Sequence, residues 1–328
     1  MRILITAPLS GVDIGGPTQY APNLAKEFEE LGYKVKIISY DRVEKILPIG
    51  LRHIYFFLKI IPSVIWADRI ITLDTFSVGV PSVWATILFD KKIVVRIGGD
   101  FLWESYVERT GDKITLKQFN FHIPKLNIKE KIILYFTKVL IRFADKLAFN
   151  TEWQRSIWEN SYDISNVKSC VVKNYIPDKN SHILTGNYFL WAGRKVKLKN
   201  IDLLKELSEE FKIEIVFGLS HAQLQEKIKN CYAVVLPSFS EVCPNFILEA
   251  ISFNKPFIVT SETGLKEICS IGGIFINPFD KKALKQAILE MLDIENYKRH
   301  KTGLESLSLS HSWQTLAKEF LSLCQLKY

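Results

Sequence analysis

Short apolar runs alternate with amphipathic stretches along most of the chain. Runs of four or five apolar residues predict buried strands of parallel sheets, and apolar positions repeating every three to four residues predict helices. The predicted strands are 2–6, 35–39, 69–73, 92–96, 146–150, 169–172, 188–192, 213–217, 233–236, 256–260 and 273–276. The predicted helices are 78–89, 128–143, 152–159, 201–211, 222–230, 246–253, 281–292 and 311–326, with a further helix before Gly32 whose inner face is Leu24, Ala25, Phe28 and Leu31.

The alternation is interrupted once, after Lys173, where a polar stretch containing Pro177 has no period. We therefore predict a linker at 176–187 between a domain at 1–175 and a domain at 188–310. Strands alternating with helices indicate the α/β class, with two doubly wound, Rossmann-like halves. A ligand is expected in the cleft between the halves.

Composition narrows the class of protein. The 328 residues are 48% hydrophobic and 24% charged, which is typical of a globular chain with enough apolar residues for two cores. The formal charge of +8 implies an acidic partner: nucleic acid, an anionic membrane or a phosphorylated substrate. Basic and aromatic residues form no nucleic-acid readout module, so nucleic acid is disfavoured.

Cysteine usage and the chain start suggest a location. The five cysteines are scattered without a C-x-x-C pair, which favours reduced thiols in the cytoplasm. The first strand begins at Arg2, so no signal peptide is expected. The longest uncharged run, Thr75 to Phe89, is too short to span a membrane.

Residues 113–146 form a basic segment with eight Lys/Arg and two acids. The helix predicted at 128–143 lies inside it and has a broad apolar face. Such a helix can lie at an anionic membrane surface or pack into the core with a solvated basic side. The sequence favours the core-packed arrangement.

Two turns in the first half carry candidate ligand contacts. Gly15 and Gly16 follow the first strand, where glycine lets a phosphate or acceptor approach the backbone. They do not form the G-x-G-x-x-G pattern, so ordinary turn glycines remain an alternative. Asp100 and Trp103 follow the strand at 92–96, at the end where open α/β sheets bind ligands. Asp100 is equally explained as a helix N-cap.

The second half carries a pair of carboxylates around a strand-to-helix turn. Glu241 lies in the turn after the strand at 233–236, and Glu249 lies on the second turn of the following helix. Pro244 and Asn245 stand where that helix begins, and its unpaired N–H groups form an anion site. These acids either bind a ligand that has both phosphates and hydroxyls, or are an exposed loop residue and a surface acid.

A cationic turn follows the strand at 188–192. Arg194, Lys195, Lys197 and Lys199 lie within six residues after Gly193. This density of cations makes an oxyanion site more plausible than a set of solvated surface charges.

Taken together, these motifs resemble the retaining glycosyltransferases of family 4, which have the GT-B fold. The resemblance rests on Gly15-Gly16, on Gly193-Arg194 with Lys199, and on Ser240-Glu241-x-x-Pro244-Asn245-x-x-Leu248-Glu249-Ala250. The tail His311-Ser312-Trp313 is similar to the closing helix of that family, so 311–328 is expected to return to the first domain. The similarity extends over essentially the whole chain.

The resemblance implies a role for each candidate residue. Donor binding is implied for Gly16, Arg194, Lys199, Glu241, Val242, Cys243, Asn245 and Glu249, and the acceptor side for Gly15, Gly16, Asp100 and Trp103. Arg194 and Lys199 would hold the donor diphosphate, and Glu249 the ribose hydroxyls. Glu241 would bind the transferred sugar and stabilise an oxocarbenium-like transition state, with Asp100 near the reaction centre. No D-x-D occurs, and no metal or cofactor is expected.

The implied activity is retaining transfer of a sugar from a nucleotide-diphosphate sugar to a glycan or lipid-linked acceptor of the cell envelope. The expected location is the cytoplasm, with an anionic membrane face as a further partner. Val242 and Cys243 depart from the family pattern, because a glycine usually follows the first glutamate, and Asn200 replaces another usual glycine. These departures keep two alternatives open: a catalytically silent subunit that binds a partner enzyme or glycan, and a nucleotide-sugar epimerase.

Overall fold

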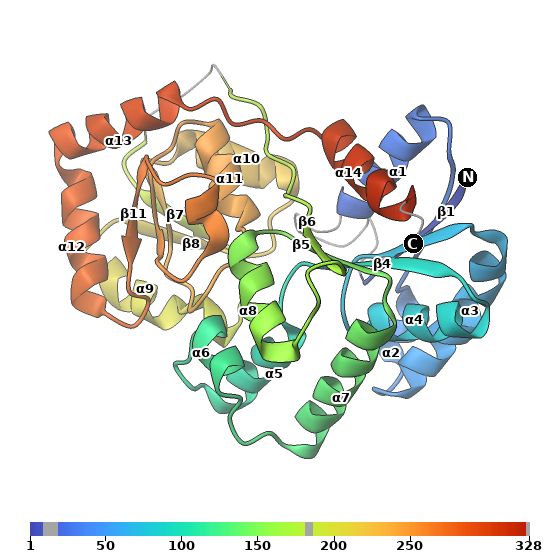
Figure 1. Ribbon diagram of the computed structural model, residues 1–328. Helices are drawn as coiled ribbons and strands as arrows, with labels where there is room; N and C mark the ends of the chain where they lie inside the picture. Colours follow the sequence, from blue (N-terminus) through green and yellow to red (C-terminus); the bar gives the residue numbers. More distant parts are fainter. Residues whose placement is uncertain (9–18, 181–185, 326–328) are drawn as a thin grey trace. The chain divides into compact units, whose positions relative to one another are not determined.

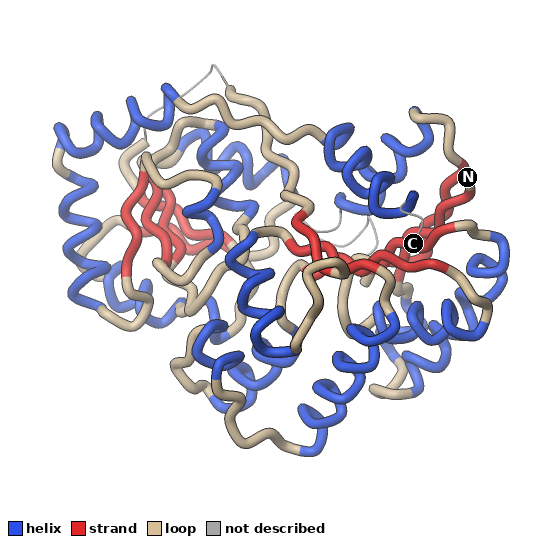
Figure 2. The backbone as a smooth tube through the Cα atoms, viewed as in Figure 1, coloured by secondary structure: helices blue, strands red, loops and turns tan. Residues whose placement is uncertain are grey.

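Two parallel sheets organise the chain, one in each of two units. The computed structural model describes residues 1–8, 19–180 and 186–325. Unit 1 comprises Met1–Leu102, Ile123–Lys173 and Ser312–Tyr328, and unit 2 comprises Trp103–His122 and Asn174–His311. Both sheets are drawn as strands flanked by helices in Figure 1 and Figure 2. Gly15 and Gly16 lie outside the described residues.

The sheet of unit 1 has six strands in the order β2-β1-β3-β4-β5-β6. Every neighbouring pair is parallel, as Ile3 pairing with both Val35 and Arg69 illustrates. The strands are β1 (Arg2–Ala7), β2 (Lys34–Ser39), β3 (Arg69–Thr72), β4 (Lys92–Ile97), β5 (Lys146–Phe149) and β6 (Ser169–Val171). The central strands are buried on both faces, which explains why they read as continuous apolar runs in the sequence.

Helices cover both faces of this sheet. Figure 1 shows α1 (Tyr20–Glu30) and α14 (Trp313–Gln325) over one face, and α2 (Arg42–Ile46), α3 (Leu51–Trp66), α4 (Gly79–Leu88) and α7 (Ile128–Phe143) over the other. Neighbouring helices of the second layer are in contact in the order α2, α3, α4, α7. α8 (Glu152–Tyr162) contacts β5 and β6.

The C-terminal helix α14 belongs to unit 1, as the family resemblance implied, and it packs against α1. Leu24, Phe28 and Phe320 are each 0% exposed in the shared core. The inner face predicted for the first helix was correct for Leu24, Ala25 and Phe28 but wrong for Leu31, which is 36% exposed. Leu31 already lies beyond the helix end at Glu30, in the turn to Gly32, so the helical period no longer applies there.

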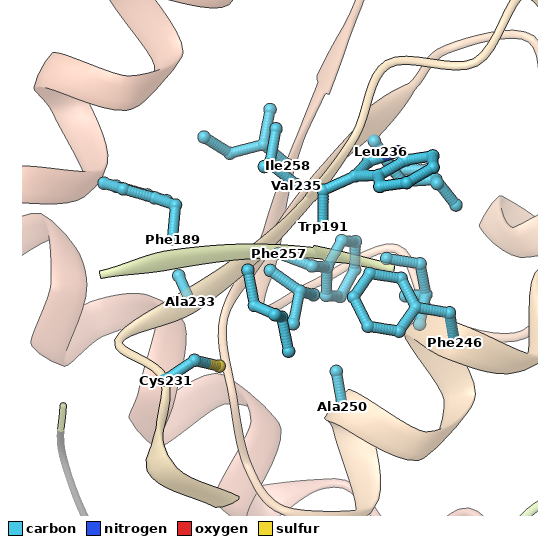
Figure 3. Close-up of a cluster of buried hydrophobic side chains, with 14 of the residues drawn as sticks. Phe189, Trp191, Cys231, Ala233, Val235, Leu236, Phe246, Ala250, Phe257 and Ile258 are labelled. Carbon is cyan, nitrogen blue, oxygen red and sulfur yellow. The ribbon is translucent and has the colours of Figure 1, made fainter. Parts of the chain in front are cut away.

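The sheet of unit 2 has five parallel strands in the order β11-β10-β9-β7-β8. They are β7 (Phe189–Ala192), β8 (Ile213–Val216), β9 (Ala233–Leu236), β10 (Phe257–Thr260) and β11 (Gly273–Ile276). Side chains from β7, β9 and β10 pack together with Phe246 and Ala250 of the helix α11 (Asn245–Ser252) (Figure 3). This core fixes the strand ends from which the candidate site extends.

Unit 2 also contains helices between its strands and after the last of them. They are η2 (Lys197–Lys199), α9 (Ile201–Ser208), α10 (His221–Asn230), α11 (Asn245–Ser252), η3 (Gly264–Glu267), α12 (Lys281–Leu292) and α13 (Ile294–Ser306). The segment 103–122, which the sequence analysis counted with the first half, groups with unit 2 and contributes α6 (Leu116–Phe121) and most of α5 (Phe101–Thr110). The predicted domain boundaries stay a prediction.

All eleven predicted strands are present, with ends within about two residues of those expected. The helices that the sequence pattern missed are α2, α5, α6 and α13, together with α3, whose apolar residues run around the whole helix and obscure its period. In the described part of the chain, no helix is both long and apolar enough to cross a membrane.

We expect Phe320→Ala to lower the melting temperature of unit 1, because truncating a fully buried phenylalanine removes about 3–5 kcal/mol from the free energy of unfolding. Differential scanning calorimetry measures the shift. Phe121→Ala is the matched control, since this side chain is 91% exposed, and should leave the melting temperature unchanged. An equal shift in both variants would contradict the packing of α14 on α1.

Candidate functional site

The order of strands in unit 2 defines where a ligand can bind. The chain leaves β7 for β8 at one edge, then crosses back to β9 on the other side of β7. β7 and β9 are therefore hydrogen-bonded neighbours, and the connections that follow them lead to strands on opposite sides, β8 and β10. In open α/β sheets, ligands bind outside the carboxyl ends of strands at such a reversal of strand order. The loops 193–200 and 237–244 both begin there.

Hydrogen bonds fasten these two loops together. The Phe239 amide donates to the Leu198 carbonyl at 2.8 Å, and the Asn200 side chain donates to the carbonyls of Pro237 and Pro278 at 3.2 and 2.7 Å. Asn200 has a φ of 55°, in the left-handed region that asparagine tolerates better than most residues. Asparagine thus serves here in a conformation that glycine usually provides, and adds two side-chain hydrogen bonds.

This arrangement brings two predicted residues into direct contact. The Lys199 ammonium donates to Glu241 Oε1, and their side chains are only 16% and 11% exposed. Pairing compensates two charges that are largely removed from water. A lysine has three N–H donors, and within the described part of the chain the Lys199 ammonium donates only to Glu241. Lys199 therefore has donors left for an anionic ligand.

Arg194 lies on the same loop but is held loosely. It forms an ion pair with Glu104 of α5 at 3.3 Å, with its own side chain 68% exposed. A nearby contact, from the Lys197 amide to Glu108 at 3.0 Å, attaches α5 to the same loop. An exposed ion pair of this kind contributes little stability, so Arg194 can change partners at low cost.

The turn of Glu241 is anchored to the loop after β10. The Glu241 amide donates to the Glu262 carbonyl at 2.9 Å, and the Gly264 amide donates to the carbonyls of Glu241 and Val242 at 3.3 and 3.1 Å. Neither Val242 nor Cys243 has a positive φ, so the valine is accommodated without backbone strain. The departure from glycine at this turn leaves its backbone conformation allowed.

The helix α11 begins at the turn, as predicted, with Pro244 as its N-cap. No side chain caps this end and its first turn holds no acid. Asn245 Oδ1 accepts a hydrogen bond from Asn174 at 3.0 Å, and Asn174 also donates to the Cys243 carbonyl at 3.1 Å. Asn174, the first residue of the segment Asn174–His311 of unit 2, therefore fixes the start of α11.

Glu249 is buried on the second turn of α11, with its side chain 9% exposed. His221, at the start of α10, approaches Glu249 Oε1 at 3.5 Å, whereas Oε2 is buried with no hydrogen-bond partner in the described part of the chain. A buried carboxylate oxygen without a donor costs free energy. A ligand hydroxyl would remove this cost.

The candidates of the first half are distributed over both units. Asp100, in unit 1, is 2% exposed and directly precedes α5. Burial of the Tyr162 phenol, and secondly the charge of Asp100, raise the pKa of Tyr162. Trp103, in unit 2, is 4% exposed, and its Nε1 donates to the Ile114 carbonyl at 3.1 Å. Their acceptor-side roles, like those of Gly15 and Gly16, stay predictions.

Comparison with known proteins places this geometry in context. Residues 187–304 match the family described as Glycosyl transferases group 1. The O-antigen chain mannosyltransferase RfbU of Salmonella typhimurium is 26% identical over 122 residues. These residues are 34% of this chain and 35% of RfbU, so the match spans about a third of each protein.

Two solved structures resemble the whole chain. Anabaena Alr3699/HepE in complex with UDP and glucose has a TM-score of 0.70 at 14% identity, covering 98% of this chain and 99% of HepE. Sucrose-phosphate synthase of Thermosynechococcus elongatus has a TM-score of 0.68 at 13% identity, covering 98% of both chains. The fold is that of GT-B glycosyltransferases.

Within this GT-B fold, two contacts of the candidate site were missed by sequence reasoning. Glu104 pairs with Arg194, and His221 pairs with Glu249. His221 follows β8 by five residues, so its position at the carboxyl end of a strand was an available signal. Glu104 gave no such signal, because its partner is 90 residues away. Among the described residues, no group of His, Cys, Asp and Glu could hold a metal ion.

We expect Glu249→Gln to lower the pKa of His221, because the hydrogen bond to Glu249 raises this pKa above the ordinary value of 6.5. A raised pKa in the folded state means that the stabilisation is complete below pH 6.5 and is lost as the pH rises through the raised pKa. NMR titration of the imidazole measures the change. His300, whose pKa is lowered chiefly by burial, is the internal control and should not move.

Proposed function

We propose that this protein is a retaining glycosyltransferase that moves a sugar from a nucleotide-diphosphate sugar to a glycan or lipid-linked acceptor. The observation that carries the proposal is the Lys199–Glu241 pair at the β7–β9 junction, inside the segment that matches the glycosyl transferases group 1 family. A cation for the donor phosphates and a carboxylate for the sugar stand next to each other. Cell-envelope polysaccharide or glycolipid synthesis is the context that we propose.

The donor diphosphate would be held by cations and backbone amides. Arg194 would leave its exposed contact with Glu104 and bind the diphosphate through its planar guanidinium. Lys199 would use the donors that Glu241 does not occupy. The uncapped start of α11 would add its N–H groups, including those of the turn at Val242, Cys243 and Asn245. These groups would neutralise the leaving diphosphate, so we propose a metal-independent reaction.

Glu249 would recognise the ribose of the donor. Its Oε2 is a buried acceptor without a donor, and its Oε1 is already directed toward His221. A ribose diol supplies hydroxyl donors of the kind that this oxygen lacks. The nucleoside would then lie near the carboxyl end of β8, close to the start of α10.

Glu241 would act at the sugar. Binding of the diphosphate to Lys199 would draw the ammonium away from Glu241 and leave its carboxylate for the sugar hydroxyls and the oxocarbenium-like transition state. We propose that Asp100, Trp103 and the glycine turn with Gly15 and Gly16 serve the acceptor side, with Asp100 near the reacting centre. Transfer would take place in the cytoplasm, with the anionic inner face of the membrane as a further partner.

We expect Glu241→Ala to lower kcat by about 100-fold or more, because it removes a charge that stabilises the transition state. Arg194→Ala should raise the KM for the donor, through loss of a charged hydrogen bond worth about 1.5–3 kcal/mol. Release of nucleoside diphosphate, measured across uridine, guanosine and adenosine diphosphate sugars, reports both effects.

Lys195→Ala is the matched control, because Lys195 is an exposed cation on the same loop and has no proposed ligand. It should retain the activity of the unaltered protein. Absence of donor binding and turnover with every nucleotide sugar would overturn the proposal. Unchanged cellular function in Glu241→Ala would favour a silent binding subunit, and sugar interconversion without an acceptor would favour an epimerase.

A further inference from the structure

An exposed apolar surface follows β2 in unit 1, where soluble proteins normally place polar side chains. We call it the apolar face, and it consists of Val43, Ile46, Ile49, Leu51, Ile54, Tyr55, Leu58 and Ile65. These large side chains are 37–82% exposed, and Ile46 reaches 82%. Scattered single apolar residues are ordinary on a surface, but these lie on α2, on α3 and on the segment that joins them, and α2 and α3 are in contact. Exposed apolar side chains grouped in this way mark an interaction site.

The helix α2 is oriented with its one acid inward. Glu44 is 0% exposed, whereas Val43 and Ile46 on the same short helix are 42% and 82% exposed. A surface helix of a water-soluble protein normally turns its apolar side chains toward the core and its charged side chains toward solvent. The orientation is fixed by a capping box in which Asp41 and Glu44 satisfy each other's backbone amides.

Lys59 of α3 locks this orientation. Its ammonium donates to Glu44 at 2.7 Å, to Asp41 at 2.9 Å and to the Ser39 carbonyl at 3.1 Å. All three of its N–H donors are used, so the contact is saturated. The ion pair between the buried Glu44 carboxylate and the Lys59 ammonium holds α2 against α3. The apolar side chains of α2 therefore face outward.

The helix α3 repeats the pattern over sixteen residues. Leu51, Ile54, Tyr55 and Leu58 follow the spacing of one helical face, and all are exposed. The inward face of the same helix includes polar His53 and Ser63, at 8% and 9% exposure. Burial lowers the pKa of His53 to about 4, so it stays neutral under the sheet at physiological pH.

Cations accompany the apolar face. Lys91 donates to the Ile65 and Ala67 carbonyls at the end of α3, and Lys36 lies 4.4 Å from the ring centre of Trp66. In the same helix layer, α7 exposes Lys129, Lys131, Lys138 and Arg142 together with Ile128, Ile132, Tyr135 and Phe143. Figure 1 shows α2, α3, α4 and α7 along one side of the sheet of unit 1.

We propose that the apolar face of unit 1 is a docking surface for an anionic lipid bilayer. Apolar and aromatic side chains would enter the headgroup region, while the surrounding lysines and arginines would contact lipid phosphates. The core-packed interpretation of α7 is correct for Ile133 and Leu140, which are buried, but the exposed Ile132, Tyr135 and Phe143 leave an apolar edge.

Charge distinguishes a bilayer from a second copy of the chain. Two copies joined symmetrically through this face would bring their own cations together, which is unfavourable for a dimer. An anionic bilayer offers opposite charge across the same area. Docking on a bilayer does not require sugar transfer, so vesicle binding can be observed in the absence of turnover, and turnover in the absence of vesicle binding.

The test is co-sedimentation of the whole protein with vesicles. We expect it to bind phosphatidylcholine vesicles containing about 30% phosphatidylglycerol, to bind pure phosphatidylcholine at least tenfold more weakly, and to be released by about 0.5 M salt. Ile46→Glu/Leu58→Glu should weaken binding by about tenfold or more. Ile46→Ser/Leu58→Ser, which adds no charge, should weaken binding in the same direction.

Leu292→Glu/Ile294→Glu is the matched control. It places the same charges on exposed apolar residues of unit 2, at 46% and 66% exposure, and should bind like the unaltered protein. The proposal is overturned if the protein does not bind anionic vesicles or if it binds neutral vesicles as tightly as anionic ones. It is also overturned if Ile46→Glu/Leu58→Glu and Leu292→Glu/Ile294→Glu change vesicle binding to the same extent. It is also overturned if light scattering shows a dimer that Ile46→Glu/Leu58→Glu separates and no vesicle binding occurs.

Discussion

The hydrogen-bonded neighbours β7 and β9 determine where unit 2 can bind a ligand. Because β8 lies on the far side of β7, the loops after β7 and β9 diverge at the carboxyl edge of the sheet. The fully buried core of β7, β9 and β10 holds these strand ends in place. Lys199 and Glu241, 42 residues apart in the chain, meet as a consequence.

Two pairings of lysine with glutamate illustrate how context changes the role of one interaction. Lys59 donates to three acceptors, and its contact with the fully buried Glu44 fixes a helix. Lys199 donates to Glu241 at the carboxyl edge of the sheet of unit 2, and its other N–H donors are not used by this contact. The first pair is saturated and therefore structural. The second compensates two charges that are largely removed from water, and it leaves further N–H donors of Lys199 unused.

Much of the fold could be predicted from the sequence. Strands buried on both faces must be apolar throughout, so each appears as a short continuous run. Short helices were harder to predict. α2 is only five residues long with its acid Glu44 inside, and α3 has apolar residues on both its buried and its exposed sides, so neither follows the apolar-in, polar-out pattern on which sequence reasoning depends.

The sequence by itself determined the α/β class, the two halves and the positions of Glu241 and Glu249 around the start of α11, because these follow from local periodicity and spacing. The return of the last helix to the first domain followed from the family resemblance. Only the tertiary structure decided which partners these residues have. The contacts of Lys199 with Glu241, Arg194 with Glu104 and His221 with Glu249 join segments that parallel crossovers bring together. The outward apolar side of α2 was likewise decided by tertiary structure, since it depends on Lys59 reaching Glu44 from the next helix. Sequence spacing cannot specify such pairings, because they arise from the order of strands and the packing of helices over them.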